Sequence, residues 1–160
     1  MKVLVIHGPN LNILGHRDPR IYGPLTLEQI HTNMEDFAKQ NKFEIEFFQS
    51  NFEGEIIDTI QECIGGEYQA IIINPGAYAH TSIAIADAIA SAGVPAVEVH
   101  LSNIFAREEF RRVSYTGMAC AGVITGFGAY SYHLALISVM QILNEIQALK
   151  EAQANQQNNA

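Results

Sequence analysis

Basic residues are scarce in this sequence of 160 residues, which has nine lysines and arginines against seventeen aspartates and glutamates. The formal net charge at pH 7 is therefore -8. A protein that binds nucleic acid without sequence preference needs a basic face to pair with the phosphates. The charge balance argues against a nucleic-acid partner.

Cysteine and long hydrophobic runs are also nearly missing. The two cysteines, Cys63 and Cys120, lie far apart and form no CxxC pair, so we interpret them as packing thiols rather than as metal ligands or a disulfide. The apolar run at the N-terminus reaches His7 and Gly8 too soon to be a signal peptide or a membrane span. We expect a cytoplasmic protein without a membrane partner.

The motifs of nucleotide and metal sites are absent as well. No GxGxxG follows the first apolar run, and no GxxxxGK[ST] occurs anywhere. Gly8 and Gly15 are too far apart to form a phosphate cradle of known type, and no histidine pair at i and i+4 stands near a carboxylate. We therefore expect a site that uses no nucleotide, metal or other cofactor.

Five short runs rich in apolar, β-branched residues predict five strands, at residues 3–6, 45–48, 70–73, 96–99 and 122–125. Segments with helical periodicity lie between and after them, at residues 26–41, 53–64, 80–92, 103–112 and 130–152. This alternation predicts an α/β fold, a flavodoxin-like three-layer sandwich with a five-stranded parallel sheet in the order 2-1-3-4-5. One domain is expected over residues 1–152, followed by a polar, frayed tail at 153–160.

Polar side chains follow three of the predicted strands. Asn10 comes soon after the first strand, Asn74 and His80 after the third, and His100 at the end of the fourth. These strands are neighbours in the expected order, and the ligands of such folds bind beyond the carboxyl ends of the strands. We expect the four side chains to line one crevice.

Glu98 and His100 lie two residues apart on a predicted strand, so their side chains share a face. The pair is either an acid with its orienting carboxylate or a structural hydrogen bond. Ser102 follows at the predicted start of a helix, where backbone N–H groups and the helix dipole favour a carboxylate ligand.

The five arginines fall in two short windows, Arg17 with Arg20 and Arg107 with Arg111 and Arg112. Such clustering is typical either of one local anion site or of surface ion pairs. At i and i+4, Arg107 and Arg111 share a face of the predicted helix, whereas Arg112 is expected to pair with Glu108.

Tyr22 lies five residues after Arg17 in the long irregular segment between Gly8 and Leu25. Free tyrosine ionises near pH 10, so a phenolate at neutral pH needs about 4 kcal/mol of stabilisation, which nearby guanidinium groups can supply. Asp87 interrupts an apolar helix two turns after His80. It is either a surface aspartate or a residue that reaches a neighbouring subunit's site.

Seven segments taken together resemble type II 3-dehydroquinate dehydratases. They are HGPNLNILG at 7–15, RIYG at 20–23, EGE at 53–55, INPGAYAHTS at 73–82, EVHLSN at 98–103, REEFR at 107–111 and GVITGFG at 122–128. The resemblance runs in order along nearly the whole chain and stops at the tail.

The resemblance implies a cofactor-free lyase that dehydrates 3-dehydroquinate to 3-dehydroshikimate through an enolate, on the shikimate route to chorismate and the aromatic amino acids. It also implies a homododecamer built from trimers. Tyr22 corresponds to the proton acceptor, Arg17 to the residue that stabilises its phenolate, and Asn10 to the residue that stabilises the enolate. His100 corresponds to the proton donor and Glu98 to the residue that orients it. The implied substrate-binding positions are Asn74, His80, Asp87 across a trimer interface, Leu101, Ser102 and Arg111, with Arg107 as a weaker correspondence near the base.

Two other kinds of protein fit parts of the pattern. A flavodoxin-like binding module would hold flavin or a small acid, and bound flavin would colour the purified protein. A scaffold protein would account for the apolar helix around Asp87, but it predicts no turnover and leaves the loop with Arg17 and Tyr22 unexplained.

Overall fold

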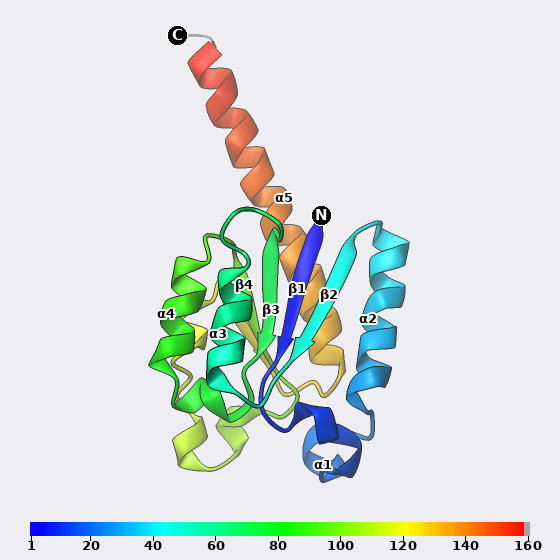
Figure 1. The fold of residues 1–160 in the computed structure, drawn as a ribbon. Coiled ribbons are helices and arrows are strands. Elements are labelled where there is room, and N and C mark those ends of the chain that lie inside the picture. Colours follow the sequence, from blue (N-terminus) through cyan, green and yellow to red (C-terminus); the bar gives the residue numbers. More distant parts are fainter. Residues whose placement is uncertain (159–160) are drawn as a thin grey trace.

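A computed structural model describes residues 1–158 and contains one five-stranded sheet, in which every neighbouring pair of strands is parallel (Figure 1). The strand order β2-β1-β3-β4-β5 confirms the predicted fold class. The strands are β1 (Lys2–His7), β2 (Glu44–Gln49), β3 (Ala70–Asn74), β4 (Ala96–His100) and β5 (Gly122–Thr125).

The central strands are covered on both faces. Every residue of β3 and β4 is buried, whereas the edge strands β2 and β5 are partly exposed. This burial explains why the central strands appear in the sequence as continuous apolar runs rather than as alternating patterns.

Two helices pack on each face of the sheet (Figure 1). α2 (Leu27–Asn41) and α5 (Tyr130–Asn158) cover one face, and α3 (Glu53–Gln61) and α4 (Ile83–Ser91) cover the other. The short helix α1 (Pro19–Tyr22) lies beyond the carboxyl ends of the strands.

The predicted helix over 80–92 begins later than expected. His80 belongs to a 3-10 turn, Gly76–His80, and the side chain of Ser82 accepts a hydrogen bond from the backbone N–H of Ile85, which caps α4. His80 and Asp87 therefore do not lie on one helix, and the prediction that Asp87 follows His80 by two turns of the same helix is wrong.

The predicted helix over 103–112 is also wrong. Two 3-10 turns, Ile104–Ala106 and Glu109–Arg111, replace it, because the backbone of Arg107 is extended (φ -105°, ψ -162°) and interrupts helical hydrogen bonding. The i, i+4 argument for Arg107 and Arg111 thus does not apply.

Helix α5 runs past the expected end at Ala152 to Asn158 and extends away from the sheet (Figure 1). The last two residues of the expected tail, 159–160, lie outside the described residues. Over residues 1–158, no helix has the length and apolar character needed to cross a bilayer.

The loops after β1 and β3 pack closely at the carboxyl end of the sheet. A Cβ atom on Gly8 would lie 2.4 Å from the carbonyl oxygen of Pro75, so only glycine fits there. Gly76 has φ +59°, a left-handed conformation that also favours glycine. These two glycines let the β1 and β3 loops meet around one cavity.

Candidate active site

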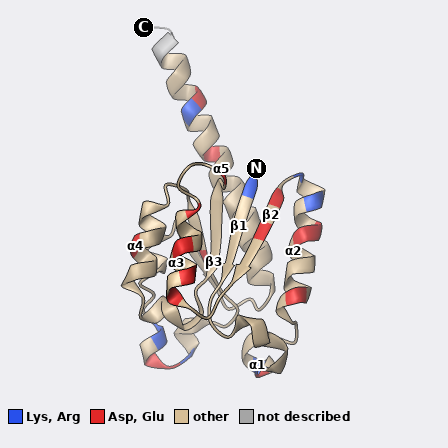
Figure 2. Ribbon diagram, in the orientation of Figure 1, with Lys and Arg blue, Asp and Glu red and all other residues tan. Residues whose placement is uncertain are grey.

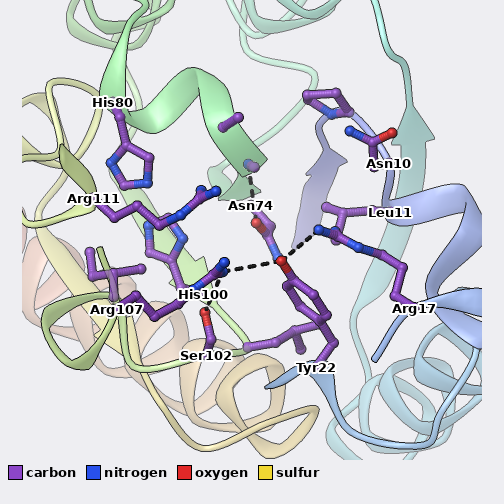
Figure 3. A pocket seen from close by; sticks show the side chains of 15 residues that line it. Asn10, Leu11, Arg17, Tyr22, Asn74, His80, His100, Ser102, Arg107 and Arg111 are labelled. Atoms are coloured by element: carbon purple, nitrogen blue, oxygen red, sulfur yellow. Dashed lines mark hydrogen bonds between the residues drawn. The ribbon is translucent and has the colours of Figure 1, made fainter. Parts of the chain in front are cut away.

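A cavity of about 150 Å³ opens at the carboxyl end of the sheet (Figure 3). Its walls come from the loops after β1, β3 and β4 and from α1, as expected at the switch point of a doubly wound sheet. The lining residues are Pro9, Asn10, Leu11, Arg17, Tyr22, Asn74, Gly76, Ala77, His80, His100, Leu101, Ser102, Ile104, Arg107 and Arg111. Asn10, Asn74, His80 and His100 therefore meet in one crevice, as the sequence predicts.

Tyr22 enters the cavity from the last position of α1, where two guanidinium groups reach its phenolic oxygen (Figure 3). Arg17 Nη2 donates at 2.5 Å and Arg107 Nη1 at 3.1 Å. The Arg17 guanidinium also lies 3.7 Å from the centre of the Tyr22 ring. Hydrogen bonds from charged donors are shorter and stronger than those between neutral groups, so these two arginines fix the position of the Tyr22 hydroxyl.

Glu108 holds the two arginines that come from the β4 side of the cavity. Its Oε2 lies 3.3 Å from Arg107 Nε and 3.0 Å from Arg111 Nε. The expected pairing of Glu108 with Arg112 is therefore wrong, because the extended backbone at Arg107 changes which side chains face Glu108. Figure 2 shows acidic residues spread over α2, α3 and β2, whereas three of the five arginines, Arg17, Arg107 and Arg111, line the cavity. An acidic protein thus has a locally cationic pocket.

The carboxylate of Glu98 lies behind His100 rather than in the cavity wall. Glu98 Oε1 is 2.7 Å from His100 Nε2 and accepts a hydrogen bond from Ser114 Oγ at 2.6 Å, while Oε2 accepts one from Thr116. Burial alone would raise the pKa of Glu98, but these hydrogen bonds lower it below the ordinary value. Glu98 is therefore an ionised, fully hydrogen-bonded anchor for the imidazole.

His80 lies beside His100 with the two rings nearly parallel, 6.2 Å apart. The carbonyl oxygen of Val113 accepts a hydrogen bond from His80 Nδ1 at 2.8 Å, which leaves Nε2 as the acceptor of a neutral ring. Burial lowers the pKa of His80, and the Val113 carbonyl opposes that effect. His80 is thus held as a neutral polar group at the pocket wall.

Two asparagines complete the wall on the side of β1 and β3. Asn10 has a left-handed backbone (φ 67°), and its N–H donates to Asn51 Oδ1 at 2.9 Å. Asn74 is buried at the end of β3, where its Oδ1 accepts from the N–H of Gly76 at 3.2 Å. The Asn74 side chain and the Asn10 backbone are therefore held by hydrogen bonds next to the cavity.

Leu101 and Ser102 line the cavity immediately after β4. The helix expected to begin at Ser102 is a 3-10 turn of three residues, so the predicted macrodipole is not present. Ser102 Oγ instead lies 3.5 Å from Arg107 Nη1.

Asp87 lies on α4, is exposed and does not line the cavity of its own chain. Neither do His7 and His16, whose relation to a ligand the sequence left open. Sequence reasoning missed Ser114 and Thr116, because an irregular segment has no periodicity that would place its hydroxyls behind Glu98.

A second hollow of about 320 Å³ lies between α2 and α5. It is mainly apolar, and His133 is the only titratable imidazole or carboxylate among its lining residues. In residues 1–158, no group of three or more His, Cys, Asp and Glu side chains is arranged to hold a metal ion. The concentration of acid, base and cationic groups makes the first cavity the candidate active site.

Comparisons with known proteins agree with this geometry. A model of the family "Dehydroquinase class II" matches residues 1–140. The chain is 71% identical over 156 residues to a 3-dehydroquinate dehydratase from Helicobacter hepaticus, covering 98% of this chain and 99% of that protein.

Two solved structures of type II dehydroquinases are also similar. The structure from Butyrivibrio crossotus has a TM-score of 0.85 at 46% identity, covering 87% of this chain and 97% of the other. The structure from Propionibacterium acnes has a TM-score of 0.81 at 38% identity, covering 84% and 92%. The chain belongs to the class II dehydroquinase family.

Proposed function

We propose that this protein is a 3-dehydroquinate dehydratase that removes water from 3-dehydroquinate to give 3-dehydroshikimate, in the shikimate pathway. One observation carries the proposal. The phenolic oxygen of Tyr22 receives hydrogen bonds from Arg17 and Arg107 in the same cavity that contains the Glu98–His100 pair. Such a site offers a base and an acid to one small ligand, which is what elimination of water next to a ketone requires.

Tyr22 acts as the base in its phenolate form. It takes the proton on the carbon next to the ketone, and the electron pair moves to the ketone oxygen to give an enolate. Because that proton is weakly acidic, the enolate needs a hydrogen-bond donor as well as a base. Asn10 supplies this stabilisation by holding a water molecule against the enolate oxygen.

His100 acts as the acid. The enolate electron pair returns and breaks the bond from carbon to the departing hydroxyl, and His100 gives that oxygen a proton, so water leaves. Its ring nitrogen Nε2 is engaged by Glu98, so the other ring nitrogen serves the substrate. The ionised carboxylate compensates an imidazolium charge and fixes the ring orientation.

The substrate is an anion, and the cationic wall suits it. Arg111 and the backbone at Leu101 and Ser102 hold the carboxylate and hydroxyl oxygens, together with Asn74 and His80. Arg107 belongs to this wall and also contacts the base.

The segment carrying Arg17 and Tyr22 closes over the bound substrate. Helix α1 has no buried residue, so its position depends on contacts made by its side chains. Closure excludes water and strengthens the electrostatic effects around the phenolate.

The working assembly is a homododecamer built from trimers, in which Asp87 contributes to the site of the adjacent subunit. Asp87 is exposed on α4 one turn after Ile83, which is 63% exposed, and the 3-10 turn that packs against α4 carries Met118, which is 75% exposed. A contiguous exposed apolar patch rimmed by polar residues marks a protein–protein interaction site. Two free cysteines, Cys63 and Cys120, support a reducing, cytoplasmic setting.

The test is an assay of the purified protein with 3-dehydroquinate. We expect ultraviolet absorbance from the conjugated enone to rise, also in the presence of a chelator and without added nucleotide. Borohydride added with substrate should leave the enzyme active, because no lysine forms a Schiff base. Absence of turnover, or covalent trapping by borohydride, would contradict the proposal.

A further inference from the structure

A row of four hydrogen-bonded side chains runs from the cavity into the protein. Asn74 Nδ2 donates to the hydroxyl of Tyr132 at 3.1 Å, and that hydroxyl lies 2.8 Å from His7 Nδ1. His7 Nε2 lies 3.0 Å from His31 Nε2 on α2. Only Asn74 among the four lines the candidate active site.

The sheet register brings these residues together. His7 ends β1 and is paired directly with Asn74 at the end of β3, so both side chains project to the same face. Tyr132 lies in the first turn of α5, which covers that face. His7 and Tyr132 are 0% and 1% exposed, so water does not compete for their hydrogen bonds.

The donor and acceptor chemistry of these groups determines the direction of each hydrogen bond in the row. The backbone N–H of Gly76 can only donate, so the Asn74 atom that it contacts is the oxygen, and the amide nitrogen faces Tyr132. The Tyr132 hydroxyl accepts from that amide, and among the described residues His7 Nδ1 is the one acceptor for its single proton, so it donates to His7 Nδ1. His7 then carries its proton on Nε2 and donates to His31.

The contacts with Gly76 and Tyr132 together fix the plane of the Asn74 side-chain amide and determine which of its ends is the oxygen. One amide N–H points to Tyr132, the oxygen accepts from Gly76, and the second N–H remains available to a ligand. If the Tyr132 hydroxyl were removed, no other hydrogen-bond acceptor among the described residues would hold the amide nitrogen of Asn74 in its position.

We propose that His7 and Tyr132 are positioning residues, which act through Asn74 to present its amide N–H to the substrate. The inference rests on the proposed function, since it assigns these residues to the binding of the same substrate. Neither residue contacts the cavity, so neither is a catalytic residue.

A purely structural role is the competing explanation, because any buried hydrogen-bonded row contributes to stability. The two explanations differ in one respect. A positioning residue loses its effect when the residue that it positions is removed, whereas a structural residue does not.

The experiment is a double-mutant cycle on kcat/KM with Tyr132→Phe, Asn74→Ala and the combined variant. We expect Tyr132→Phe alone to lower kcat/KM about tenfold and to cause no further loss in the Asn74→Ala background. Tyr130→Phe is the matched control, because Tyr130 is 58% exposed on the same helix and lies outside the row. Thermal unfolding of each variant reports its folding.

A second pair of variants tests His7 if Tyr132→Phe fails to fold. His7→Gln retains an oxygen that can accept from Tyr132, and His7→Leu does not, so we expect activity to be kept in the first and reduced in the second. Wild-type activity in both Tyr132→Phe and His7→Leu, or an equal loss with and without Asn74, would overturn the inference. If the wild-type protein itself does not act on 3-dehydroquinate, the proposed function fails instead.

Discussion

The phenolic oxygen of Tyr22 lies 2.5 Å from Arg17 Nη2, and the same guanidinium group lies 3.7 Å from the centre of the tyrosine ring. The two residues are five apart in the chain, on either side of the start of α1. One cation therefore contacts both the oxygen and the ring of the residue that we propose as the base.

Replacing Tyr22 by phenylalanine tests the base directly. Tyr22→Phe should lower kcat by about 10² to 10⁴-fold, because the ring remains but the proton acceptor is lost. Ligand binding, measured by calorimetry, and thermal unfolding should change little. Tyr130→Phe serves as the control, and normal turnover by Tyr22→Phe would exclude this residue as the base.

Replacing Arg17 by glutamine tests the stabilisation of the phenolate. Arg17→Gln removes one of two charged donors on the oxygen and should lower kcat/KM by about 10 to 100-fold. Arg112→Gln is the matched control, since Arg112 does not line the cavity. Equal effects of the two substitutions in steady-state kinetics would contradict the assigned role.

Glu98→Gln should separate charge from hydrogen bonding behind His100. The amide can still contact the imidazole and the hydroxyls of Ser114 and Thr116, but it no longer compensates a positive ring. We expect kcat to fall by about 100-fold or more, with a smaller change in KM. Steady-state kinetics check this, and a wild-type kcat would mean that the negative charge of Glu98 is not needed for catalysis.

Stability should decrease in mild acid because of His7. Burial, with a smaller contribution from neighbouring His31, lowers the pKa of His7 from 6.5 to about 3. Below pH 6.5 the unfolded chain binds a proton that folded His7 does not, so the free energy of unfolding falls as the pH falls towards 3. The loss from this residue reaches about 2 kcal/mol near pH 5.

Urea unfolding at about pH 7.5 and about pH 5, at one protein concentration, measures the acid effect. His7→Gln should show a smaller difference between the two pH values than the wild type, because it has no proton to gain. If the free energy of unfolding changed with pH by the same amount in both proteins, groups other than His7 would be the cause.

Asp87→Asn tests the contribution of a neighbouring subunit. We expect activity to fall even though Asp87 is absent from the cavity of its own chain. Light scattering separates a loss of assembly from a loss at the site. Asp58→Asn, an exposed aspartate on α3, is the control, and full activity of Asp87→Asn would argue against a shared site.

The strand order and the cavity could be predicted because they depend on local patterns. Buried strands have continuous apolar runs, and Asn74 and His100 directly end two neighbouring strands. Once the order of a parallel sheet is known, residues at its carboxyl edge must meet. The chemical roles came from resemblance, because spacing alone left the Glu98–His100 pair compatible with a structural hydrogen bond.

The features that the sequence did not predict depend on contacts between segments far apart in the chain. Helical periodicity over 103–112 gave no sign that Arg107 is extended and turns towards Tyr22, 85 residues earlier in the chain. The bond between His7 and Tyr132 spans 125 residues and involves a histidine in an apolar strand, which has no local signal. Such pairings arise only when the sheet and helices are packed.

The side-chain contacts that hold α1 at the cavity are the same contacts that would stabilise the phenolate in the mechanism proposed above. The four-residue helix has no fully buried residue, and its tyrosine is held by packing against the core and by the guanidinium groups of Arg17 and Arg107, which contact its hydroxyl. A substitution that weakens those bonds would therefore both loosen α1 and, in the proposed mechanism, leave less of the tyrosine in the phenolate form that removes the proton. Substitutions meant to change access to the cavity without changing the reaction would therefore have to avoid Arg17, Tyr22 and Arg107.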